Sequence, residues 1–308
     1  MAHAAGAVTT ARDGQGRSAA RTGDFLVRAV FPAPAVLAIV ALLIFPTAYN
    51  AYISLFSWYI SKPAEWIGLG NYAEMLWRDE RFWGAVGRTA YLALLTIPAE
   101  LALGTAIAVL FRQRIPGGAL LRVLFMLPMV ATPVAMALVW GMLLTPTGGL
   151  VNDLLERVGL SPLLWVTHPD TVMPSLALVD VWQWTPMVTL IVLAGLESLP
   201  PEPFEAAVID GASAWRAFRS ITLPLLRPVL AVAGMFRTID GLKNFDVIYV
   251  MTQGGPGTSS ETLNVYIYQT GFNYLHLGYS SALIMVLLVI VFGTSVGLSR
   301  LRQRSWQY

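Results

Sequence analysis

The sequence predicts an all-α protein that crosses a membrane about six times. Hydrophobic residues make up 56% of the 308 residues and charged residues only 12%, a balance that fits a polytopic membrane protein better than a soluble domain. Long apolar segments recur along the chain, and each approaches the roughly 20 residues that a helix needs to cross the hydrocarbon core. The positive charges gather in alternate connections between these segments, as the positive-inside rule requires.

Six segments qualify as membrane-spanning helices by length and hydropathy. They cover residues 30–54, 89–111, 119–144, 173–196, 225–250 and 281–300. The prolines inside or near these spans are Pro46, Pro98, Pro128, Pro133 and Pro186. Because neighbouring helices satisfy the carbonyls that proline frees in a bilayer, we expect kinked helices packed around a cavity.

The residues before the first span form a region of different character. Residues 1–28 are rich in Ala, Gly, Thr and Arg and show no apolar periodicity, so we expect a disordered cytoplasmic tail. The apolar run from Val30 is too long for a cleaved signal peptide, and we expect it to stay in the membrane. Residues 29–308 then form one six-helix transmembrane domain.

The arginines orient this domain. With the amino terminus inside, the cytoplasmic segments hold thirteen arginines, whereas the opposite segments hold five cationic residues. The cytoplasmic set is Arg12, Arg17, Arg21, Arg28, Arg112, Arg114, Arg122, Arg216, Arg219, Arg227, Arg300, Arg302 and Arg304. The opposite set is Lys62, Arg78, Arg81, Arg88 and Arg157. This bias predicts that both termini, and the connection after the fourth span, are cytoplasmic.

The connections on the opposite side are expected to carry structure of their own. Aromatic residues in 57–86, around a predicted turn at Gly68–Tyr72, indicate either anchoring at the membrane interface or contact with an extracytoplasmic partner. They include Trp58, Trp66, Tyr72, Trp77, Phe82 and Trp83. Within 145–172, the segment Asn152–Gly159 predicts a short amphipathic helix on the membrane surface. The Gly- and Pro-rich segment Thr252–Gly257 predicts a stop after the fifth span.

Several classes of site are excluded or not expected. Cysteine is absent, which excludes disulfides and thiolate metal sites. The only histidines, His3, His168 and His276, lie far apart without ligand spacing, so we expect no metal site. The only lysines are Lys62 and Lys243, and no Gly-x-x-x-x-Gly-Lys-Ser/Thr sequence occurs, so the chain lacks the phosphate cradle of a P-loop ATPase.

A specific motif stands in the cytoplasmic connection between the fourth and fifth spans. It reads Glu-Ala-Ala, three residues, Gly, nine residues, Ile, one residue, Leu-Pro, at Glu205, Ala206, Ala207, Gly211, Ile221, Leu223 and Pro224. The pattern resembles the EAA loop of the membrane subunits of ATP-binding-cassette (ABC) importers. This resemblance implies that residues 197–224 form a coupling loop, whose short helix sits in a groove on a separate ATPase subunit with Glu205 and Asp210 facing it.

The local chemistry of this loop favours a helix and a turn. The proline-rich stretch 200–203 is typical of a helix start. Glu202 and Glu205 fall in the first turn, where the helix dipole favours negative charge. Gly211 costs about 1 kcal/mol of helix propensity relative to Ala, so we expect close packing or a turn of the chain there. The resemblance implies a bend after the docking helix.

The fifth span is unusually polar. It holds Arg237, Asp240, Lys243, Asn244 and Asp246, although a charge near the bilayer centre costs about 2.5–3.5 kcal/mol even on a mild insertion scale. At 100° per residue, one stripe contains Arg237, Asp240, Gly241 and Asn244, while Asp246 points away. Such a stripe faces a wet cavity or another helix. An internal Arg237–Asp240 pair that only stabilises packing is the alternative.

The fourth span presents a second polar face. Asp180, Gln183 and Trp184 share one side of the helix, and a carboxylate, an amide and an indole together suit a neutral polyhydroxylated ligand. For Trp182 we favour simple packing. Glu100 in the second span is another buried carboxylate, which pairs with a helix of a partner subunit or takes part in gating.

Several segments narrow the resemblance to ABC permeases that import sugars, polyols or glycerol phosphate. These are Asp180-Val-Trp-Gln-Trp-Thr-Pro186, the EAA loop, the segment from Phe236 to Asp246, and Thr252-Gln-Gly-Gly-Pro256. The similarity covers nearly everything after the tail. It implies solute contacts at Asp180, Gln183, Trp184, Met187, Arg237 and Gly241, to which the polar stripe adds Asp240 and Asn244. Arg237 and Gly241 differ from the maltose-type pattern, so the sugar itself is not implied.

The resemblance also implies an assembly in the bacterial inner membrane. A solute-binding protein delivers the sugar or polyol, and two ATP-binding-cassette subunits, which hold ATP and Mg, drive alternating access through the Glu205 helix. A second permease, related but different, completes the path, with a homodimer as the alternative. No cofactor in this chain and no nucleic acid partner are expected.

Other functions remain open alternatives. An importer of phosphorylated or anionic solutes, such as glycerol phosphate, would use Arg237 and Lys243 as counter-charges, but Asp180, Asp240 and Asp246 roughly cancel them. An intramembrane enzyme requires a catalytic set that the sequence lacks. A proton-coupled carrier leaves the EAA loop without a purpose.

Overall fold

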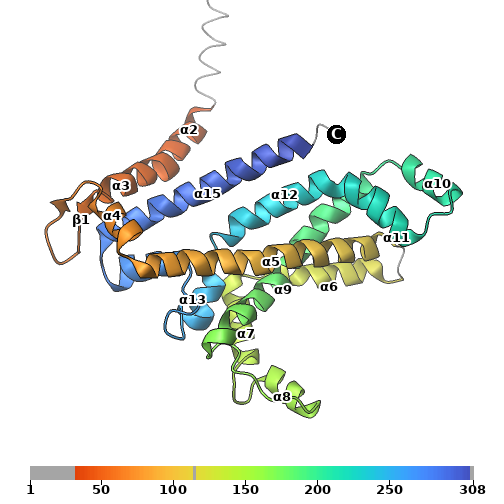
Figure 1. Cartoon of the computed structure of the whole chain (residues 1–308), viewed down its shortest axis with the longest axis horizontal. Helices are drawn as coiled ribbons and strands as arrows, with labels where there is room; N and C mark the ends of the chain where they lie inside the picture. The colour runs from red at the N-terminus through yellow and green to blue at the C-terminus, as the bar shows by residue number, and fades with distance from the viewer. Residues whose placement is uncertain (1–31, 114–115, 306–308) are drawn as a thin grey trace, which may run out of the picture. The chain divides into compact units, whose positions relative to one another are not determined.

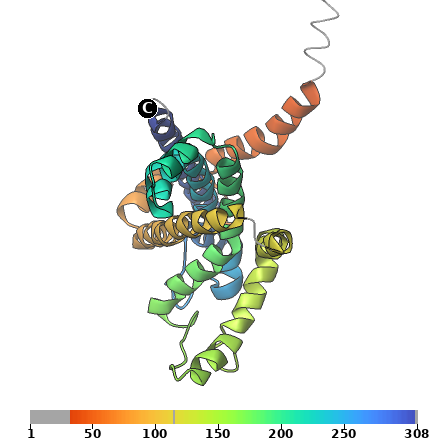
Figure 2. The same cartoon turned by 90° about the vertical axis from the view of Figure 1, so that its right-hand side faces the viewer.

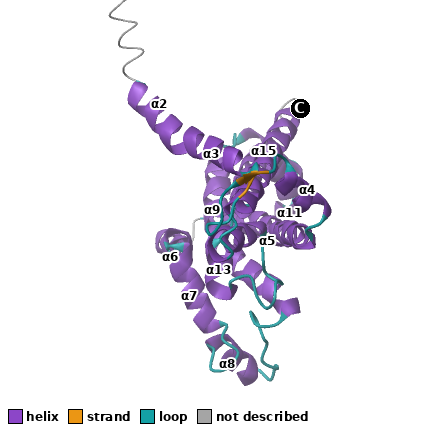
Figure 3. Cartoon of the chain, turned by 90° about the vertical axis from the view of Figure 1, so that its left-hand side faces the viewer, coloured by secondary structure: helices purple, strands orange, loops and turns teal. Residues whose placement is uncertain are grey.

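A computed structural model describes residues 32–113 and 116–305 of the chain. The predicted tail, residues 1–28, and Arg114 lie outside the described residues. The chain divides into two parts, Met1–Ile53 and Ser54–Tyr308. The all-α prediction is confirmed, because helices form nearly all of the described secondary structure (Figure 3). The exception is one antiparallel pair of two-residue strands, β1 (Phe56–Ser57) and β2 (Glu65–Trp66).

The first part contains the first predicted span. It is one continuous helix, composed of α2 (Ala33–Ile39), the wider turn η1 (Val40–Ile44) and α3 (Phe45–Ile53). In η1 the N–H of Phe45 donates to the carbonyl of Val40, five residues earlier. The next residue is Pro46, whose ring would collide with a carbonyl of a regular α-helix, and the wider turn accommodates it.

The second part is built on four long helices (Figure 1). These are α5 (Glu80–Arg112), α9 (Pro169–Glu197), the continuous run α11 (Ala214–Ala217), η2 (Phe218–Thr222) and α12 (Leu223–Gly241), and α15 (Leu277–Ser305). They correspond to the second, fourth, fifth and sixth predicted spans. A Cβ added to Gly104 would lie 2.7 Å from Cγ1 of Val188, so glycine lets α5 and α9 pack closely.

The third predicted span, 119–144, is bent, as its prolines predict. It consists of α6 (Gly118–Val130) and α7 (Pro133–Leu143), which meet at an angle of 97°. Figures 2 and 3 show α7 leaving α6 at this corner. Thr132 is extended, with φ −64° and ψ +138°. A residue before a proline disfavours the helical conformation, and Pro133 suits the first turn of a new helix. The helix therefore breaks at Thr132.

The fifth span also ends earlier than predicted. α12 stops at Gly241 rather than near residue 250, and α13 (Asp246–Thr252) begins a new helix. The amide of Asn264 donates to the carbonyl of Leu242 at 3.1 Å, which satisfies a backbone group that the break frees. The predicted stop after this segment is confirmed, since α13 ends at Thr252 and Gln253 adopts a left-handed conformation with φ +51°.

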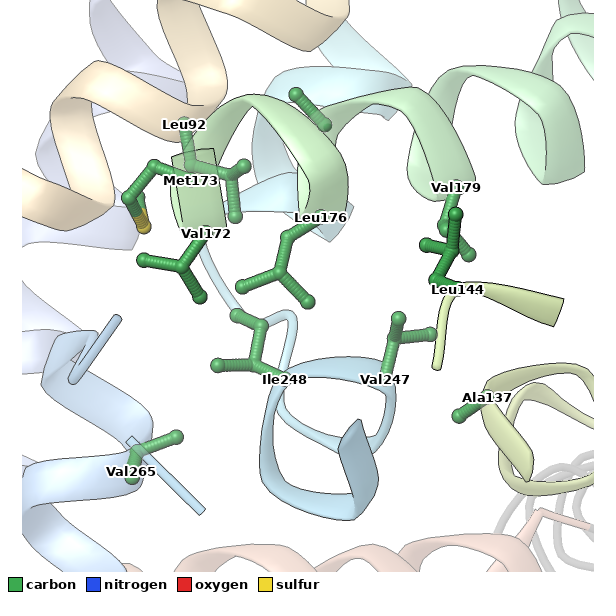
Figure 4. Packing of buried hydrophobic residues seen from close by; sticks show 11 residues of the cluster. Leu92, Ala137, Leu144, Val172, Met173, Leu176, Val179, Val247, Ile248 and Val265 are labelled. Atoms are coloured by element: carbon green, nitrogen blue, oxygen red, sulfur yellow. The ribbon is translucent and has the colours of Figure 1, made fainter. Parts of the chain in front are cut away.

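The buried apolar residues of α7, α9 and α13 form a common core (Figure 4). Leu176 and Val179 of α9 and Val247 and Ile248 of α13 are among its members, and each is at most 2% exposed. α13 therefore packs inside the second part of the chain instead of extending α12.

Short helices form the remaining connections. They are α4 (Gly70–Trp77), α8 (Leu150–Arg157), α10 (Glu202–Ile209), α14 (Leu263–Tyr268) and the wide turn η3 (Gln269–Asn273). α8 confirms the helix predicted within Asn152–Gly159. The predicted turn at Gly68–Tyr72 is correct only at Gly68, with φ +56°, because Gly70 already begins α4.

Candidate functional site

The predicted coupling segment forms two helices joined by a sharp turn. α10 carries Glu202 and Glu205 in its first turn, as expected from the helix dipole. α10 and α11 lie at the carboxyl-terminal end of α5, and α4 lies at the other end (Figure 1). The guanidinium of Arg112, the last residue of α5, lies 5.1 Å from the ring centroid of Phe204 and holds α10 at this end.

Gly211 makes the turn after α10. It adopts φ +67°, and its N–H donates to the carbonyl of Val208 at 3.1 Å. The next N–H, of Ala212, donates to the carbonyl of Ala207 at 2.9 Å, which completes the pairing of a Schellman cap. An added Cβ at Gly211 would have no heavy atom within 4 Å. The turn therefore accounts for glycine, and no close packing against the described residues of this chain requires it.

The outer face of α10 is apolar and uncovered in this chain. Ala207 is buried against the protein, whereas Val208 is 77% and Ile209 86% exposed. Glu205 and Asp210 are also exposed. Two large aliphatic side chains beside two carboxylates form a surface suited to another protein.

The second site centres on Arg237, which is fully buried. Its Nε and Nη2 donate to the two oxygens of Glu100 at 2.5 and 2.8 Å. Nη2 also donates to Asp180 at 3.0 Å, and Nη1 donates to Asp240 at 2.8 Å. A guanidinium has five N–H donors, and these bonds use four of them. Arg237 is therefore committed to carboxylates of its own chain.

This cluster joins three long helices. Glu100 comes from α5, Asp180 from α9, and Arg237 and Asp240 from α12. The predicted pair of Arg237 and Asp240 is confirmed, but it is one edge of a larger network. Both oxygens of Glu100 accept from Arg237 within the chain, so Glu100 has a partner of its own, and its pairing with a partner subunit or its role in gating stays a prediction. Since an unpaired charge in the membrane is costly, the four side chains stabilise one another.

Asn244 reaches the cluster by an unexpected route. The sequence places it on a helical stripe with Arg237, but α12 ends at Gly241. A turn instead brings its amide to Asp180, to which it donates at 2.9 Å. Lys243 and Asp246 of the same segment are exposed and stay outside the cluster. Gly241 closes α12, and an added Cβ there would lie 3.8 Å from Ile97.

The polar face of α9 borders the cluster. Trp184 lies beneath Arg237, whose Cζ is 5.1 Å from the ring centroid, so a cation covers one face of the indole. Gln183 is fully buried, and neither its oxygen nor its nitrogen has a hydrogen-bond partner among the described residues. Met187 lies one turn further on and is half-buried. Trp182 packs edge-on against Trp140 at 5.4 Å, which agrees with the packing role expected for it.

The cluster leaves one side accessible. The side chains of Glu100, Asp180 and Arg237 are at most 2% exposed, whereas that of Asp240 is 48% exposed. A ligand that approaches from the Asp240 side meets carboxylate and amide groups. It meets no cation of the cluster that is free to pair with it. The sequence does not predict the contact between Glu100 and Arg237, although an arginine and a carboxylate in separate spans are a signal for such a pair.

Residues 100–304 match the family described as binding-protein-dependent transport system inner membrane component. The chain is 37% identical over 275 residues to the sulfoquinovosyl glycerol transport system permease protein SmoG of Agrobacterium fabrum, with 87% of each chain covered. It is 35% identical over 269 residues to the trehalose/maltose transport system permease protein MalF of Thermococcus litoralis, with 85% of this chain and 89% of that protein covered.

A solved structure has a similar fold. One chain of a bacterial alginate ABC transporter, in complex with an alginate pentasaccharide-bound periplasmic protein, matches with a TM-score of 0.80. The match covers 92% of this chain and 96% of that chain at 22% identity. At this identity the likeness concerns the fold alone.

Proposed function

This chain belongs to the binding-protein-dependent transport system inner membrane components, and on that premise we propose that it passes a neutral sugar or polyol across the membrane by alternating access. It is a permease subunit of an ABC importer and not an enzyme. The relatives named above carry sugar-containing solutes in their names, which supports a sugar as the solute, while its neutrality rests on the Arg237 cluster and not on these names. The particular sugar is left to experiment.

The observation that carries the proposal is that carboxylates of the same chain already use most of the N–H donors of Arg237. Three carboxylates surround this one guanidinium, and four of its five N–H groups are already used. An anionic solute would therefore meet excess negative charge instead of a free counter-charge. Lys243, the other cation of this segment, is exposed and outside the cluster. A neutral solute fits these groups better than a phosphorylated one.

The solute contacts that we propose are the polar groups with spare capacity at the edge of the network. Asp240 is half-exposed, and Gln183 has a buried amide with no partner in this conformation. Amides and carboxylates hydrogen-bond hydroxyls well, and the uncovered face of Trp184 suits the apolar face of a sugar ring. Movement of α9 against α12 would uncover Gln183. Asp180, Asn244, Met187, Arg237 and Gly241 complete the proposed lining.

We propose that α10 receives the force for this movement. Its exposed Val208 and Ile209, with Glu205 and Asp210, form the surface for a separate ATPase subunit that holds ATP and Mg. Ala206, Ala207 and Gly211 shape the helix and its turn. The second half of the EAA pattern, Ile221, Leu223 and Pro224, lies where η2 passes into α12. The groups that meet the ATPase and the groups that meet the solute thus belong to connected helices.

The assembly that we propose has five further properties. Two copies of the ATPase subunit act with this chain, a second and related permease completes the path, and an extracytoplasmic solute-binding protein delivers the solute. Both termini are cytoplasmic, and the chain itself needs no cofactor. The excess of arginines on the coupling side supports this orientation.

Transport by the reconstituted complex tests the proposal. Proteoliposomes that contain the assembled transporter and its binding protein are assayed for uptake of trehalose, maltose, glycerol and glucose 6-phosphate. We expect uptake of one neutral compound and none of glucose 6-phosphate. Gln183→Leu should raise KM for the transported compound at least about fivefold, the value of one hydrogen bond. The matched control is Thr189→Val, on the same helix, whose hydroxyl bonds to the carbonyl of Thr185.

Two results contradict the proposal. Exclusive uptake of glucose 6-phosphate would overturn the solute class. An unchanged KM in Gln183→Leu, with Thr189→Val also unchanged, would remove Gln183 from the solute path.

A further inference from the structure

A polar cavity of about 350 Å³ lies at the amino-terminal end of α5. Its walls come from the end of α4, the start of α5, the segment α14–η3 and the start of α15. Asp79 of the cavity and Glu100 of the Arg237 cluster are separated by about 30 Å along α5, at 1.5 Å per residue. The coupling helix α10 lies at the other end of α5. The cavity is therefore distinct from both sites described above.

Polar side chains that hydrogen-bond to one another frame the cavity. Asp79 accepts hydrogen bonds from the hydroxyls of Tyr266 at 2.6 Å and Tyr279 at 2.5 Å, and also caps α5 through the N–H of Phe82. Arg81 forms two bonds, of 2.8 and 2.7 Å, to Glu261. These bonds tie the start of α5 to α14 and α15. The site is thus largely formed before any ligand arrives, as small-molecule sites usually are.

Two polar atoms at the cavity have no partner among the described residues. Oγ1 of Thr270 belongs to a residue only 4% exposed, and Nε2 of His276 is buried as well. Both residues line the cavity. Burial lowers the pKa of His276, which favours the neutral imidazole with one donor and one acceptor. Buried polar groups are normally hydrogen-bonded, so these two atoms have unused capacity for a polar ligand.

The remaining lining favours a neutral ligand with both hydroxyl and apolar faces. Charged residues balance, because Glu74 and Asp79 oppose Arg78 and Arg81. Aromatic rings offer flat apolar faces. Tyr59 stacks on His276 with the ring centroids 3.9 Å apart, and Tyr274 is 53% exposed. Aromatic faces beside free hydrogen-bonding groups are the combination that binds sugar rings.

We propose that this cavity binds a neutral mono- or disaccharide, with Thr270 and His276 as hydrogen-bond partners and Tyr274 as a stacking face. The inference goes beyond the proposed transport role, and only the placement of the cavity on the extracytoplasmic side rests on that role. The volume fits such a ligand, since about 300–1,000 Å³ is typical of small-molecule sites.

Binding to the assembled transporter tests this site. The complex of both permeases and the ATPase subunits is placed in lipid nanodiscs without the binding protein, and trehalose binding is measured by calorimetry, with glucose 6-phosphate as the charged comparison. We expect Thr270→Val to weaken trehalose binding about fivefold, the value of one hydrogen bond. Tyr274→Ala should weaken it by a similar factor. Matched controls are Thr294→Val in α15, whose hydroxyl bonds to Ile290, and Tyr91→Ala, a similarly exposed tyrosine of α5.

The outcomes separate this inference from the proposed function. One outcome would overturn the cavity as a sugar site. In that outcome Gln183→Leu abolishes trehalose binding, whereas Thr270→Val and Tyr274→Ala bind trehalose within twofold of wild type. Preferential binding of glucose 6-phosphate that depends on Thr270 would overturn it as well. If the cavity instead receives a side chain of the binding protein, Thr270→Val weakens docking of that protein and leaves trehalose binding unchanged, which also overturns the inference. Uptake assays of the Gln183 variant test transport independently.

Discussion

Arg237 binds Glu100 through two parallel hydrogen bonds, although 137 residues separate them in the sequence. The two oxygens of one carboxylate face two nitrogens of one guanidinium, an arrangement stronger and more directional than a single contact. The pair fixes α12 against α5 inside the membrane-spanning region. It also provides Asp180 and Asp240 with a shared cation.

Loss of this cation should destabilise the protein. Arg237→Met leaves Glu100 and Asp180 buried without a counter-charge, and breaking a buried pair costs about 3–5 kcal/mol. We expect a lower thermal unfolding temperature for the complex in nanodiscs. Lys243→Met, which removes an exposed cation a few residues away, is the control and should unfold like wild type. Equal stability of the two variants would show that the cluster does not support the fold.

Substitution at Gly211 should uncouple ATP hydrolysis from uptake. Its φ of +67° costs an L-residue about 1–2 kcal/mol, and a β-branched residue more. Gly211→Val should distort the turn after α10 and reduce uptake per ATP hydrolysed, while membrane insertion stays normal. Gly211→Asn, which tolerates this conformation better, should retain more coupling. Gly297→Ala, in open space on α15, is the matched control. Normal coupling in Gly211→Val would contradict the role of the turn.

A larger side chain at Gly104 should separate α5 from α9. The added Cβ would lie 2.7 Å from Val188 and 3.2 Å from the backbone nitrogen of Thr189. Gly104→Ala should destabilise the protein by about 1–3 kcal/mol, as overpacking of cores does. Gly87→Ala, on the same helix with nothing within 4 Å, should not destabilise the protein, because alanine favours the helix by about 0.5–1 kcal/mol over glycine. Val188→Ala should partly rescue Gly104→Ala, and thermal unfolding in nanodiscs decides between these outcomes.

A charge on the exposed face of α10 should prevent assembly with the ATPase subunit. Ile209 is 86% exposed, so Ile209→Asp leaves the fold intact but introduces a carboxylate into the proposed contact. We expect loss of co-purification of the ATPase subunit, with normal thermal stability of the permease. Ile60→Asp changes an equally large side chain, 58% exposed, in the connection between β1 and β2, and should assemble normally. Undiminished co-purification of Ile209→Asp would place the contact elsewhere.

Local sequence patterns predict the helices and the coupling turn well. Proline before Glu202, acidic residues in the first turn and Gly211 after the last turn are short-range signals, and α10 follows them. The proline after Thr132 predicts a kink there, but it does not predict how sharply the chain turns. The prediction that Asn244 lies near Arg237 is correct, but its reason is wrong. It assumes a continuous helix where the chain turns.

Contacts between distant segments could not be predicted in this way. Glu100 and Arg237 lie on helices whose pairing depends on the packing of the whole bundle. The cavity at the amino-terminal end of α5 combines residues near 60–80 with residues near 260–280, and neither group forms a motif alone. Periodicity identifies which face of a helix is polar, but it carries no information on which other helix that face meets.

The helix from Ala214 to Gly241 is continuous and begins shortly after the turn at Gly211. Arg237 stands about 35 Å from the start of that helix, at 1.5 Å per residue. A tilt of about 10° would sweep the guanidinium through about 6 Å, more than twice the length of any of its hydrogen bonds to carboxylates. A small rocking motion at the turn made by Gly211 is thus geometrically sufficient to separate Arg237 from its carboxylate partners.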